Sequence, residues 1–476
     1  MKKNLDRRDF LKGAALLGAG ATLPVHVFAQ ERSPKAVGAN DLLRIAVCGV
    51  KGRGLAHIGE WTKMKDVQVA AIVDIDENVI HDGMSRVEKA GGAKPVYYQD
   101  WRKMLEDKSI DAMSVATCNH THTLLSLTGC QAGKHVYVEK PLSHNVWEGR
   151  KLVEAARKYG RVVQHGTQSR SSGALRRALG WAQGGALGKI KVSRGLCYKL
   201  RPSIKHTPEE PVPPGVNYDL WLGPAPLRPF TKNRFHYNWH WHWDYGNGDI
   251  GNQGVHEIDI ARWALGKNEL PKKVISIGGR FGYEDDGETP NTQIALFDYG
   301  DSILIFEVRG LPTEGYKGVK VGDVIHCEKG YLVGPKAFDA DGKEIKVEGP
   351  DAPGGDHFRN FIDTVKGGRR EDQRADVLEG HLSASLCHLA NVSYRLGEKQ
   401  GFSKKDPFGS YSDGNETFER MCAHLKAEGV DLDRAQLQVG KTLSIDTAAE
   451  TIVGDSKAAG MLTREYRKPY VVPDQV

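Results

Sequence analysis

The sequence predicts an α/β protein of two domains: a doubly wound parallel sheet, followed by an α+β domain with a large open, mostly antiparallel sheet. First, apolar runs of strand length alternate with helical segments as far as residue 165, as in parallel sheets. Second, the later runs alternate apolar and polar residues, as half-buried antiparallel strands do. Third, a chain of 476 residues is longer than a domain with a single hydrophobic core, which rarely exceeds about 250–300 residues.

The first 29 residues are typical of an export signal. Arg7 and Arg8 precede an apolar stretch over 13–23, and a cleavage site is expected after Ala29. The apolar stretch is about half of the ~20 residues that a membrane-spanning helix needs, so we expect no stable membrane anchor. We therefore expect a twin-arginine signal at 1–29, the twin-arginine export machinery as a partner, and a periplasmic or otherwise exported protein.

Charge and cysteine usage narrow the class of protein further. Removing residues 1–29 lowers the formal net charge from +6 to +3, and no long block of like charge remains, so nucleic-acid binding has no support. The seven cysteines show neither CxxC pairs nor the spacing of a disulfide framework. We expect plain core thiols in a chain that folds in the reducing cytoplasm before export.

A polar linker at 30–40 separates the signal from a first domain at 41–165. Parallel strands are expected at 42–49, 67–74, 110–117, 135–139 and 161–164, with helices at 54–64, 80–90 and 146–159. The second domain is expected at 166–476. Its predicted strands are 188–198, 274–281, 292–297 and 303–308, its predicted helices are 357–366 and 375–396, and the tail from 402 is mixed.

A glycine turn joins the first strand to the first helix. Its sequence is Gly49-Val50-Lys51-Gly52-Arg53-Gly54, with the spacing G-x-x-G-x-G rather than G-x-G-x-x-G. Backbone N–H groups and the helix dipole at such a turn favour a pyrophosphate, as in the Rossmann fold. We therefore expect Gly49, Lys51, Gly52, Arg53 and Gly54 to bind a dinucleotide; a purely structural loop is the alternative.

Asp74 ends the second strand, 25 residues after Gly49. A carboxylate at this place can accept both ribose hydroxyls of adenosine and repel a 2′-phosphate, which favours NAD over NADP. The alternative is that Asp74 or Asp76 only caps the next helix.

Two further strand ends carry polar side chains. Thr117, Asn119 and His122 follow the strand at 110–117, and Glu139 and Lys140 follow the strand at 135–139. Ligands of open α/β sheets bind at this carboxyl edge, so we assign these five residues to the cofactor site. Pro141 stops the strand and restricts Lys140, whose ammonium group can then hold a substrate hydroxyl or pass a proton.

Several of these motifs together resemble one family, the glucose-fructose oxidoreductase and inositol dehydrogenase family (Gfo/Idh/MocA). The motifs are the glycine turn, Asn119-His120-Thr121-His122, residues 133–141 with their Glu-Lys-Pro sequence, residues 248–259 and residues 464–469. The resemblance covers nearly all of the mature chain. It implies NAD(P), a sugar or cyclitol substrate, and dimers or tetramers formed through the open sheet.

The resemblance also implies catalytic roles. Lys140 takes the place of the family's lysine beside nicotinamide and substrate, and His256 takes the histidine place of its D-x-x-x-H pair. The aspartate of that pair is Asn252 here. Because an amide cannot accept a proton, we assign Asn252 to substrate binding. Asp259 is either a substitute partner for His256, also at the substrate, or part of a helix salt bridge.

Residues 235–246 are unusually aromatic. Aromatic rings beside polar groups suit a sugar, so we expect Trp243 and Tyr245 to contact a carbohydrate substrate; core packing is the alternative. His240 and His242 could ligate a metal, but the spacing implies no third ligand, and we predict no metal.

These observations predict an exported NAD(P)-dependent oxidoreductase that transfers hydride from a sugar or cyclitol hydroxyl to a tightly held nicotinamide, most simply NAD. Outside the cytoplasm no soluble NAD pool is expected to exchange with the protein. The alternative is an NAD-dependent glycosidase that resembles the exported α-N-acetylgalactosaminidase-type members of the superfamily, oxidises the sugar transiently and shows no net redox change. A third interpretation is a non-catalytic sugar-binding protein.

Overall fold

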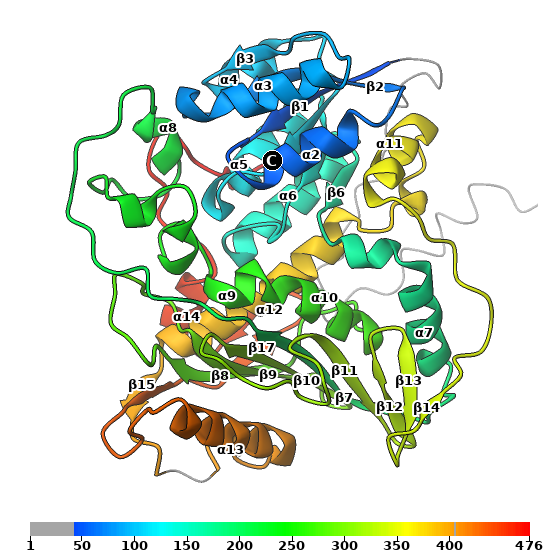
Figure 1. Ribbon diagram of the computed structural model, residues 1–476, viewed down its shortest axis with the longest axis vertical. Helices are drawn as coiled ribbons and strands as arrows, with labels where there is room; N and C mark the ends of the chain where they lie inside the picture. The colour runs from blue at the N-terminus through cyan, green and yellow to red at the C-terminus, as the bar shows by residue number, and fades with distance from the viewer. Residues whose placement is uncertain (1–41, 404–405) are drawn as a thin grey trace, which may run out of the picture. The chain divides into compact units, whose positions relative to one another are not determined.

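A computed structural model describes residues 42–403 and 406–476 and contains two β-sheets (Figure 1). The expected signal peptide at 1–29 and the linker at 30–40 lie outside the described residues. The predicted fold class is confirmed: a parallel sheet with helices on both faces precedes a larger, mostly antiparallel sheet. Within the described ranges, no helix is both long enough and apolar enough to cross a membrane.

The first sheet has six parallel strands in the order β3-β2-β1-β4-β5-β6. The strands are β1 (Leu43–Cys48), β2 (Val67–Val73), β3 (Val96–Tyr98), β4 (Ala112–Val115), β5 (His135–Val138) and β6 (Val163–His165). The helices are α2 (Arg53–Trp61), α3 (Ile80–Lys89), α4 (Trp101–Glu106), α5 (Asn119–Gln131) and α6 (Val146–Lys158), with a 3-10 turn η1 (Glu77–Val79). The strand order reverses between β1 and β4, where a ligand crevice is expected.

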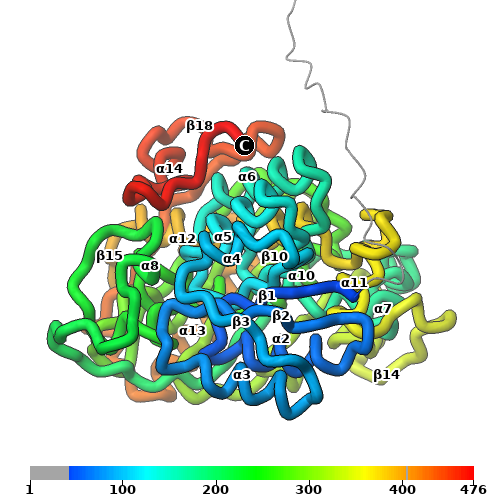
Figure 2. The backbone as a smooth tube through the Cα atoms, turned by 90° about the horizontal axis from the view of Figure 1, so that it is seen from above, coloured from blue at the N-terminus to red at the C-terminus, as the bar shows by residue number. Residues whose placement is uncertain are grey.

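Side chains on both faces of β1 are buried in apolar clusters, which explains the run of apolar residues in its sequence. Ile45 and Val47 join one core cluster, and the alternate residues Ala46 and Cys48 join the other. Both clusters also recruit residues from far beyond 165. These are Phe358, Phe361, Ile362 and Val365 of α11 (His357–Gly367) in the first cluster, and Leu220, Val377, Ala384, Tyr470 and Val472 in the second. The C-terminus accordingly lies beside the helices of the first sheet (Figures 1 and 2).

The second sheet has twelve strands, with the main path β14-β13-β12-β11-β7-β10-β9-β8-β16-β15. Off this path, β17 pairs with β8, and β18 pairs with β17. The pairs are antiparallel except for β7 with β10. The strands are β7 (Ile190–Tyr198), β8 (Lys273–Gly279), β9 (Thr292–Asp298), β10 (Ile303–Arg309), β11 (Val321–Cys327), β12 (Gly330–Val333), β13 (Lys336–Asp339), β14 (Glu344–Ile345), β15 (Glu398–Gln400), β16 (Leu437–Val439), β17 (Leu443–Asp446) and β18 (Thr451–Val453).

The remaining helices belong to the second part of the chain. They are α7 (Gly173–Gln183), α8 (Tyr218–Leu222), α9 (Gly248–Asn252), α10 (Gly254–Ala264), α12 (Val377–Arg395), α13 (Ser412–Ala427) and α14 (Ser456–Gly460). Short 3-10 turns are η2 (Gln168–Ser171), η3 (Lys232–Arg234), η4 (Asn238–Trp241) and η5 (Arg370–Asp372).

The expectation of half-buried strands is wrong for the centre of the second sheet. Strands β8, β9 and β10 are buried at nearly every position, because core clusters cover both of their faces. Their polar residues pair inside the protein instead of facing water: the Gln293 side-chain amide donates to the Ser276 hydroxyl at 2.9 Å. The alternating sequence therefore reflects buried polar pairing and not an exposed face.

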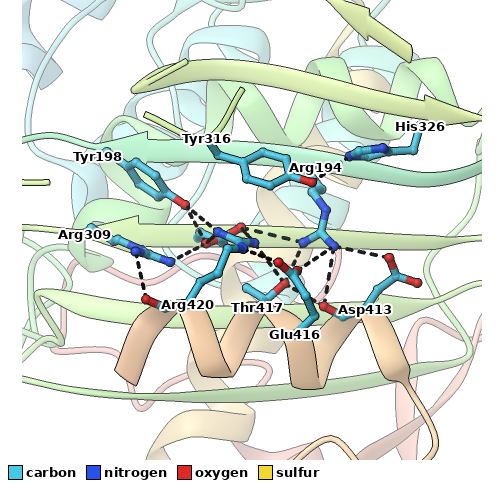
Figure 3. Close-up of polar contacts among 10 residues, drawn as sticks. Arg194, Tyr198, Arg309, Tyr316, His326, Asp413, Glu416, Thr417 and Arg420 are labelled. Carbon is cyan, nitrogen blue, oxygen red and sulfur yellow. Dashed lines mark hydrogen bonds and ion pairs between the residues drawn. The ribbon is translucent and has the colours of Figure 1, made fainter. Parts of the chain in front are cut away.

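Helix α13 covers one face of this sheet through a buried ionic network (Figure 3). The Arg420 guanidinium lies 2.8 Å from the Glu307 carboxylate, and Arg194 donates to the Thr417 hydroxyl at 2.6 Å. Glu307 is 1% exposed, so its charge requires these partners. The network fixes the helix on strands β7 and β10.

Candidate active site at the carboxyl edge of the first sheet

The turn from β1 into α2 contains three glycines with different steric roles. Gly49 has a φ of +83°, and a Cβ there would lie 2.7 Å from the Ala116 carbonyl oxygen. A Cβ on Gly54 would lie 1.9 Å from the Gly49 carbonyl oxygen, so glycine lets α2 pack against the strand. A Cβ on Gly52 would meet no atom within 4 Å. The protein itself thus has no steric need for glycine at 52, as expected where another molecule approaches the backbone.

The first turn of α2 is also open to a ligand. Gly52 is its N-cap residue, and no side chain of the described residues caps the helix. Uncapped N–H groups and the positive end of the helix dipole attract phosphate. Lys51 is exposed beside them. The residues present therefore fit a dinucleotide pyrophosphate at this turn.

Asp74 lies at the end of β2 and contacts the glycine turn directly. Its carboxylate accepts hydrogen bonds from the N–H groups of Val50, at 2.7 Å, and Asp76, at 3.1 Å. Burial raises the pKa of Asp74 to about 6. Asp76, and not Asp74, caps the following turn, since its carboxylate accepts from the Asn78 N–H at 3.0 Å. Asp74 is therefore left with acceptor capacity beside the turn, where a ribose would lie.

Replacing Asp74 by alanine is expected to lower the retained dinucleotide at pH 7.5 by about tenfold or more, because a hydrogen bond to a charged group contributes about 1.5–3 kcal/mol. In the native protein, retention should also fall as the pH drops through about 6, where the carboxylate becomes protonated. Asp74→Asn should lose this pH dependence. Mass analysis of the protein after gel filtration measures the bound nucleotide. An unchanged content in Asp74→Ala would contradict the ribose assignment.

At the end of β4, three predicted residues are tied to other parts of the protein. The buried Asn119 side-chain amide donates to the Asn247 side chain at 3.1 Å. The His122 ring lies between the carbonyl oxygens of Pro141, at 2.7 Å, and Thr117, at 3.0 Å. Each ring nitrogen of His122 faces a carbonyl oxygen, the neutral ring donates to one of the two, and the ring connects the ends of β4 and β5. His122 holds the edge in place and presents no free nitrogen to a ligand.

Glu139 joins the end of β5 to helix α2. Its carboxylate accepts hydrogen bonds from Arg53 Nε, at 2.8 Å, and from His57 Nε2, at 3.0 Å. Burial opposes its ionisation, but the hydrogen bond from His57 and the nearby positive charges hold the pKa of Glu139 well below its usual range. Sequence reasoning did not identify His57. Its spacing of four residues from Arg53 on one helix, which places both on one face, was the available signal.

Lys140 reaches from the end of β5 to α9 of the second domain. Its ammonium group donates to the Asn252 backbone oxygen at 2.9 Å and lies 3.4 Å from the Asn252 side-chain oxygen. Burial lowers the pKa of Lys140. The structure therefore brings Lys140 and Asn252 together, with the amide accepting from the ammonium group.

The His256 ring lies near the same ammonium group. It is half-buried on α10, and no hydrogen bond to its ring is formed by any residue in 42–403 or 406–476. Burial and then the Lys140 charge lower its pKa to about 4. The ring is accordingly neutral at pH 7, and its unprotonated nitrogen is free to accept a proton.

Asp259 does not pair with His256. Its fully buried carboxylate lies 2.8 Å from Arg170 Nε and 2.9 Å from Arg170 Nη2, and it accepts from the Ser383 hydroxyl at 2.7 Å. Arg262, three residues later on the same helix, lies 3.8 Å away. Of the two sequence interpretations, the structure favours the salt bridge. Asp259 fixes α10, and we leave it out of the substrate contacts.

Comparison with known families accounts for both domains. Residues 43–167 match the NAD-binding Rossmann fold of an oxidoreductase family, and residues 178–410 match the C-terminal alpha/beta domain of the same family. The chain belongs to the Gfo/Idh/MocA family. A further match, over residues 4–24, is to the twin-arginine translocation signal sequence, which directs export across the membrane.

Curated relatives of this Gfo/Idh/MocA chain include glycosyl hydrolase family 109 proteins. One from Shewanella sp. (strain ANA-3) is 29% identical over 170 residues, and one from Shewanella pealeana is 30% identical over 168 residues. Each alignment covers 32% of this chain and 37% of the relative, so the chain spans little more than a third of those relatives' length.

Solved structures share the fold. The WlbA dehydrogenase from Bordetella pertussis, in complex with NADH and UDP-GlcNAcA, is 19% identical with a TM-score of 0.54, covering 73% of this chain and 96% of that one. A putative oxidoreductase from Klebsiella pneumoniae is 16% identical with a TM-score of 0.52, covering 80% and 99%.

The aromatic run of this Gfo/Idh/MocA chain mostly forms a core. Tyr245 is 1% exposed and packs with six other buried residues: Trp221, Leu222, Ala225, Phe230, Phe235 and Trp239. The Trp243 ring packs against Tyr394 and the Arg395 guanidinium, 5.1 Å away. Because the Tyr245 ring lies in this core and the Trp243 ring packs against Tyr394 and Arg395, we withdraw Trp243 and Tyr245 from the substrate contacts.

Two histidines of the run have different surroundings. His240 lies on η4, which packs against α9, and the Lys140 charge contributes to lowering its pKa. The His242 ring is 3.0 Å from the Asn233 carbonyl oxygen. In the described part of the chain, no three His, Cys, Asp or Glu side chains are arranged to hold a metal ion.

Proposed function

We propose that the protein is an exported oxidoreductase that holds a nicotinamide dinucleotide and acts on a hydroxyl group of a sugar or cyclitol. The observation that carries this proposal is the environment of Lys140. Its ammonium group is held 2.9 Å from the Asn252 oxygen, beside the unpartnered ring of His256 and at the same sheet edge as the glycine turn. A hydroxyl in this crevice would meet a fixed cation and a neutral base together.

The chain's own residues would divide the work. Lys140 orients the substrate hydroxyl, and a His256 ring nitrogen accepts its proton. Asn252 holds the Lys140 ammonium group in place. When bound, the nicotinamide supplies the acceptor for hydride. The glycine turn and Asp74 would hold the other end of the dinucleotide, about the pyrophosphate and ribose.

We propose NAD rather than NADP as the dinucleotide. The Asp74 carboxylate, ionised above a pH of about 6, lies where a ribose would be bound and would repel a 2′-phosphate. Because the protein is exported, the cofactor must stay bound. It must then be restored by a second substrate, or later in the same turnover.

Restoration in the same turnover is the second candidate function: an NAD-dependent glycosidase that oxidises the sugar, eliminates the aglycone, adds water to the resulting double bond and reduces the carbonyl again. Two observations favour it. The family 109 relatives align with about a third of the chain, and Asn252 occupies the place where dehydrogenases of the family have a carboxylate. In this scheme no net oxidation occurs.

Two assays on the purified protein separate the candidates. Free sugars with an artificial electron acceptor should be turned over by the oxidoreductase, whereas aryl glycosides should release their aglycone only with the glycosidase. Activity in neither assay, across a broad panel of sugars and with dinucleotide present in the protein, would contradict both.

Export through the twin-arginine route yields a separate prediction. Replacing both Arg7 and Arg8 by lysine should trap the protein inside the cell, because the arginine pair is the feature that the export machinery reads. Fractionation and immunoblotting of cells that express each version measure this. A double variant that appears outside the cytoplasm at the native level would contradict the signal assignment.

A further inference from the structure

A long segment of the second domain lies against the dinucleotide edge of the first. We call residues 204–246, between β7 and α9, the strap. Figure 1 shows it in green, including α8, along the side of the first sheet. Its backbone pairs with the loop that follows β2: the Asn217 N–H donates to the Ile75 carbonyl at 2.8 Å, and the Glu77 N–H donates to the Gly215 carbonyl at 3.1 Å. The strap therefore touches the loop that carries the predicted ribose ligand.

The approach at this contact is close. Gly215 has a φ of +82°, and a Cβ there would lie 2.6 Å from the Glu77 side chain. Val216 forms a β-bridge with Asp76. The Asn78 side-chain amide adds a hydrogen bond to the Pro214 carbonyl at 2.9 Å. Glycine at 215 thus permits a contact that a larger residue would hold open.

One side chain of the strap continues this contact toward the glycine turn. His236 Nε2 lies 3.1 Å from the carboxylate of Asp76. Asp76 is only 3% exposed. His236 holds a φ of +59°, uncommon for a residue with a side chain. Its pKa is lowered by burial, raised by Asp76 and lowered again by Lys51 of the glycine turn. The contact with Asp76 therefore holds the ring against the ribose-side loop.

Four residues later, His240 lies on η4, which packs against α9, the helix that carries the Lys140 partner Asn252. His240 Nδ1 donates to the Tyr237 carbonyl at 2.5 Å, and its ring stacks on Trp239 with 3.6 Å between centroids. Gly246 has no room for a Cβ, which would lie 2.5 Å from the His240 carbonyl oxygen. Lys140 acts electrostatically on this ring. Four extended residues reach at most about 14 Å, so one short piece of chain runs from the ribose end toward Lys140.

The strap is built as a rigid element. Its aromatic cluster supplies a core of its own. At the far side, the Asp286 carboxylate accepts from the Thr207 N–H, at 2.9 Å, and from the Asn233 amide, at 2.9 Å. Arg467 of the C-terminal segment forms an ion pair with Asp219 of α8. These contacts hold the strap in place away from the ribose-side loop.

We propose that the strap is the outer wall of the dinucleotide site and makes the cofactor a resident group, with His236 as the positioning residue that closes the ribose end. The inference rests on the proposed function, because it requires a dinucleotide at the glycine turn. The strap then limits the release of the cofactor, in addition to the contacts that the glycine turn and Asp74 make with it. This also implies that the cofactor is loaded before the strap docks.

The test measures cofactor release, not activity. His236→Asn and His236→Gly both tolerate a positive φ and remove the contact with Asp76 without new strain. His206→Asn is the matched control, because its ring forms an exposed ion pair on the same strap, 2.7 Å from Asp286 and away from the edge. Each protein is purified with its nucleotide, mixed with an excess of an NAD-consuming enzyme, and followed by the loss of bound nucleotide over time. Thermal unfolding is measured in parallel.

We expect both His236 variants to release nucleotide at least tenfold faster than the native protein, and His206→Asn to stay within twofold of it. Equal release rates in native protein and both His236 variants would overturn the inference while leaving the proposed function standing. A native protein that carries no dinucleotide and cannot be loaded with it during refolding would instead remove the proposed function. The melting temperatures separate this effect from a general loss of stability. If His206→Asn is destabilised as much as the His236 variants and releases nucleotide equally fast, the inference is contradicted.

Discussion

Replacing Lys140 by methionine is expected to reduce turnover by about 10²- to 10⁴-fold and to leave the dinucleotide bound. The ammonium group stands at the reacting end, where Asn252 holds it at 2.9 Å, whereas the glycine turn and Asp74 lie toward the other end of the cofactor. Methionine keeps most of the side-chain volume and removes the charge. His256→Ala should behave in the same way, since it removes the neutral ring that accepts the proton.

Nucleotide content by mass analysis and turnover with sugar substrates are measured on the same preparations. Lys134→Met is the matched control: Lys134 is also buried, but its ammonium group donates to the backbone carbonyls of Asp107 and Ile110, at 2.6 and 2.7 Å. That control should lose stability and keep its turnover per folded molecule. A Lys140→Met protein with native turnover would remove the lysine from the mechanism.

Alanine at Gly52 and alanine at Gly54 are expected to fail in opposite ways. At Gly52 the added methyl group meets no protein atom within 4 Å, so the fold should keep its native melting temperature while nucleotide binding falls at least tenfold. At Gly54 the methyl group would lie 1.9 Å from the Gly49 carbonyl oxygen, and overpacking of this kind costs about 1–3 kcal/mol or more. Gly54→Ala should therefore unfold at a clearly lower temperature.

Calorimetry and nucleotide analysis of the two variants separate the effects. A Gly52→Ala protein that melts normally and binds nucleotide normally would show that nothing approaches the backbone at this turn. A Gly54→Ala protein of native stability would show that the turn can relax away from the strand.

The parallel sheet was predictable because its strands are buried on both faces and leave unbroken apolar runs such as Leu43–Cys48. The same logic failed for β8 to β10. There, buried polar residues such as Gln293 pair with one another and imitate the alternation of an exposed sheet. Helix α13 was also missed: its apolar side faces a sheet that only the folded chain provides.

For the site, motifs at strand ends were informative because parallel topology collects such ends at one edge. Lys140 and His256 are 116 residues apart in the sequence, and burial and then the Lys140 charge lower the pKa of His256. Aromatic residues carry no such positional information, since rings suit a core as well as a sugar, and Tyr245 lies in the core. The role of His236 depends on a positive φ and on a partner 160 residues away, and neither leaves a local pattern in the sequence.

The packing of Tyr470 and Val472 into a core of the first domain bears on how the chain is made. While the ribosome is still synthesising the second domain, β1 to β6 are already outside the exit tunnel, but that core lacks side chains that arrive about 300 residues later. At about 5–20 residues per second, the gap amounts to some tens of seconds. Over that time the apolar cluster that Tyr470 and Val472 complete is still without them. Completion of the nucleotide domain is therefore a post-translational event.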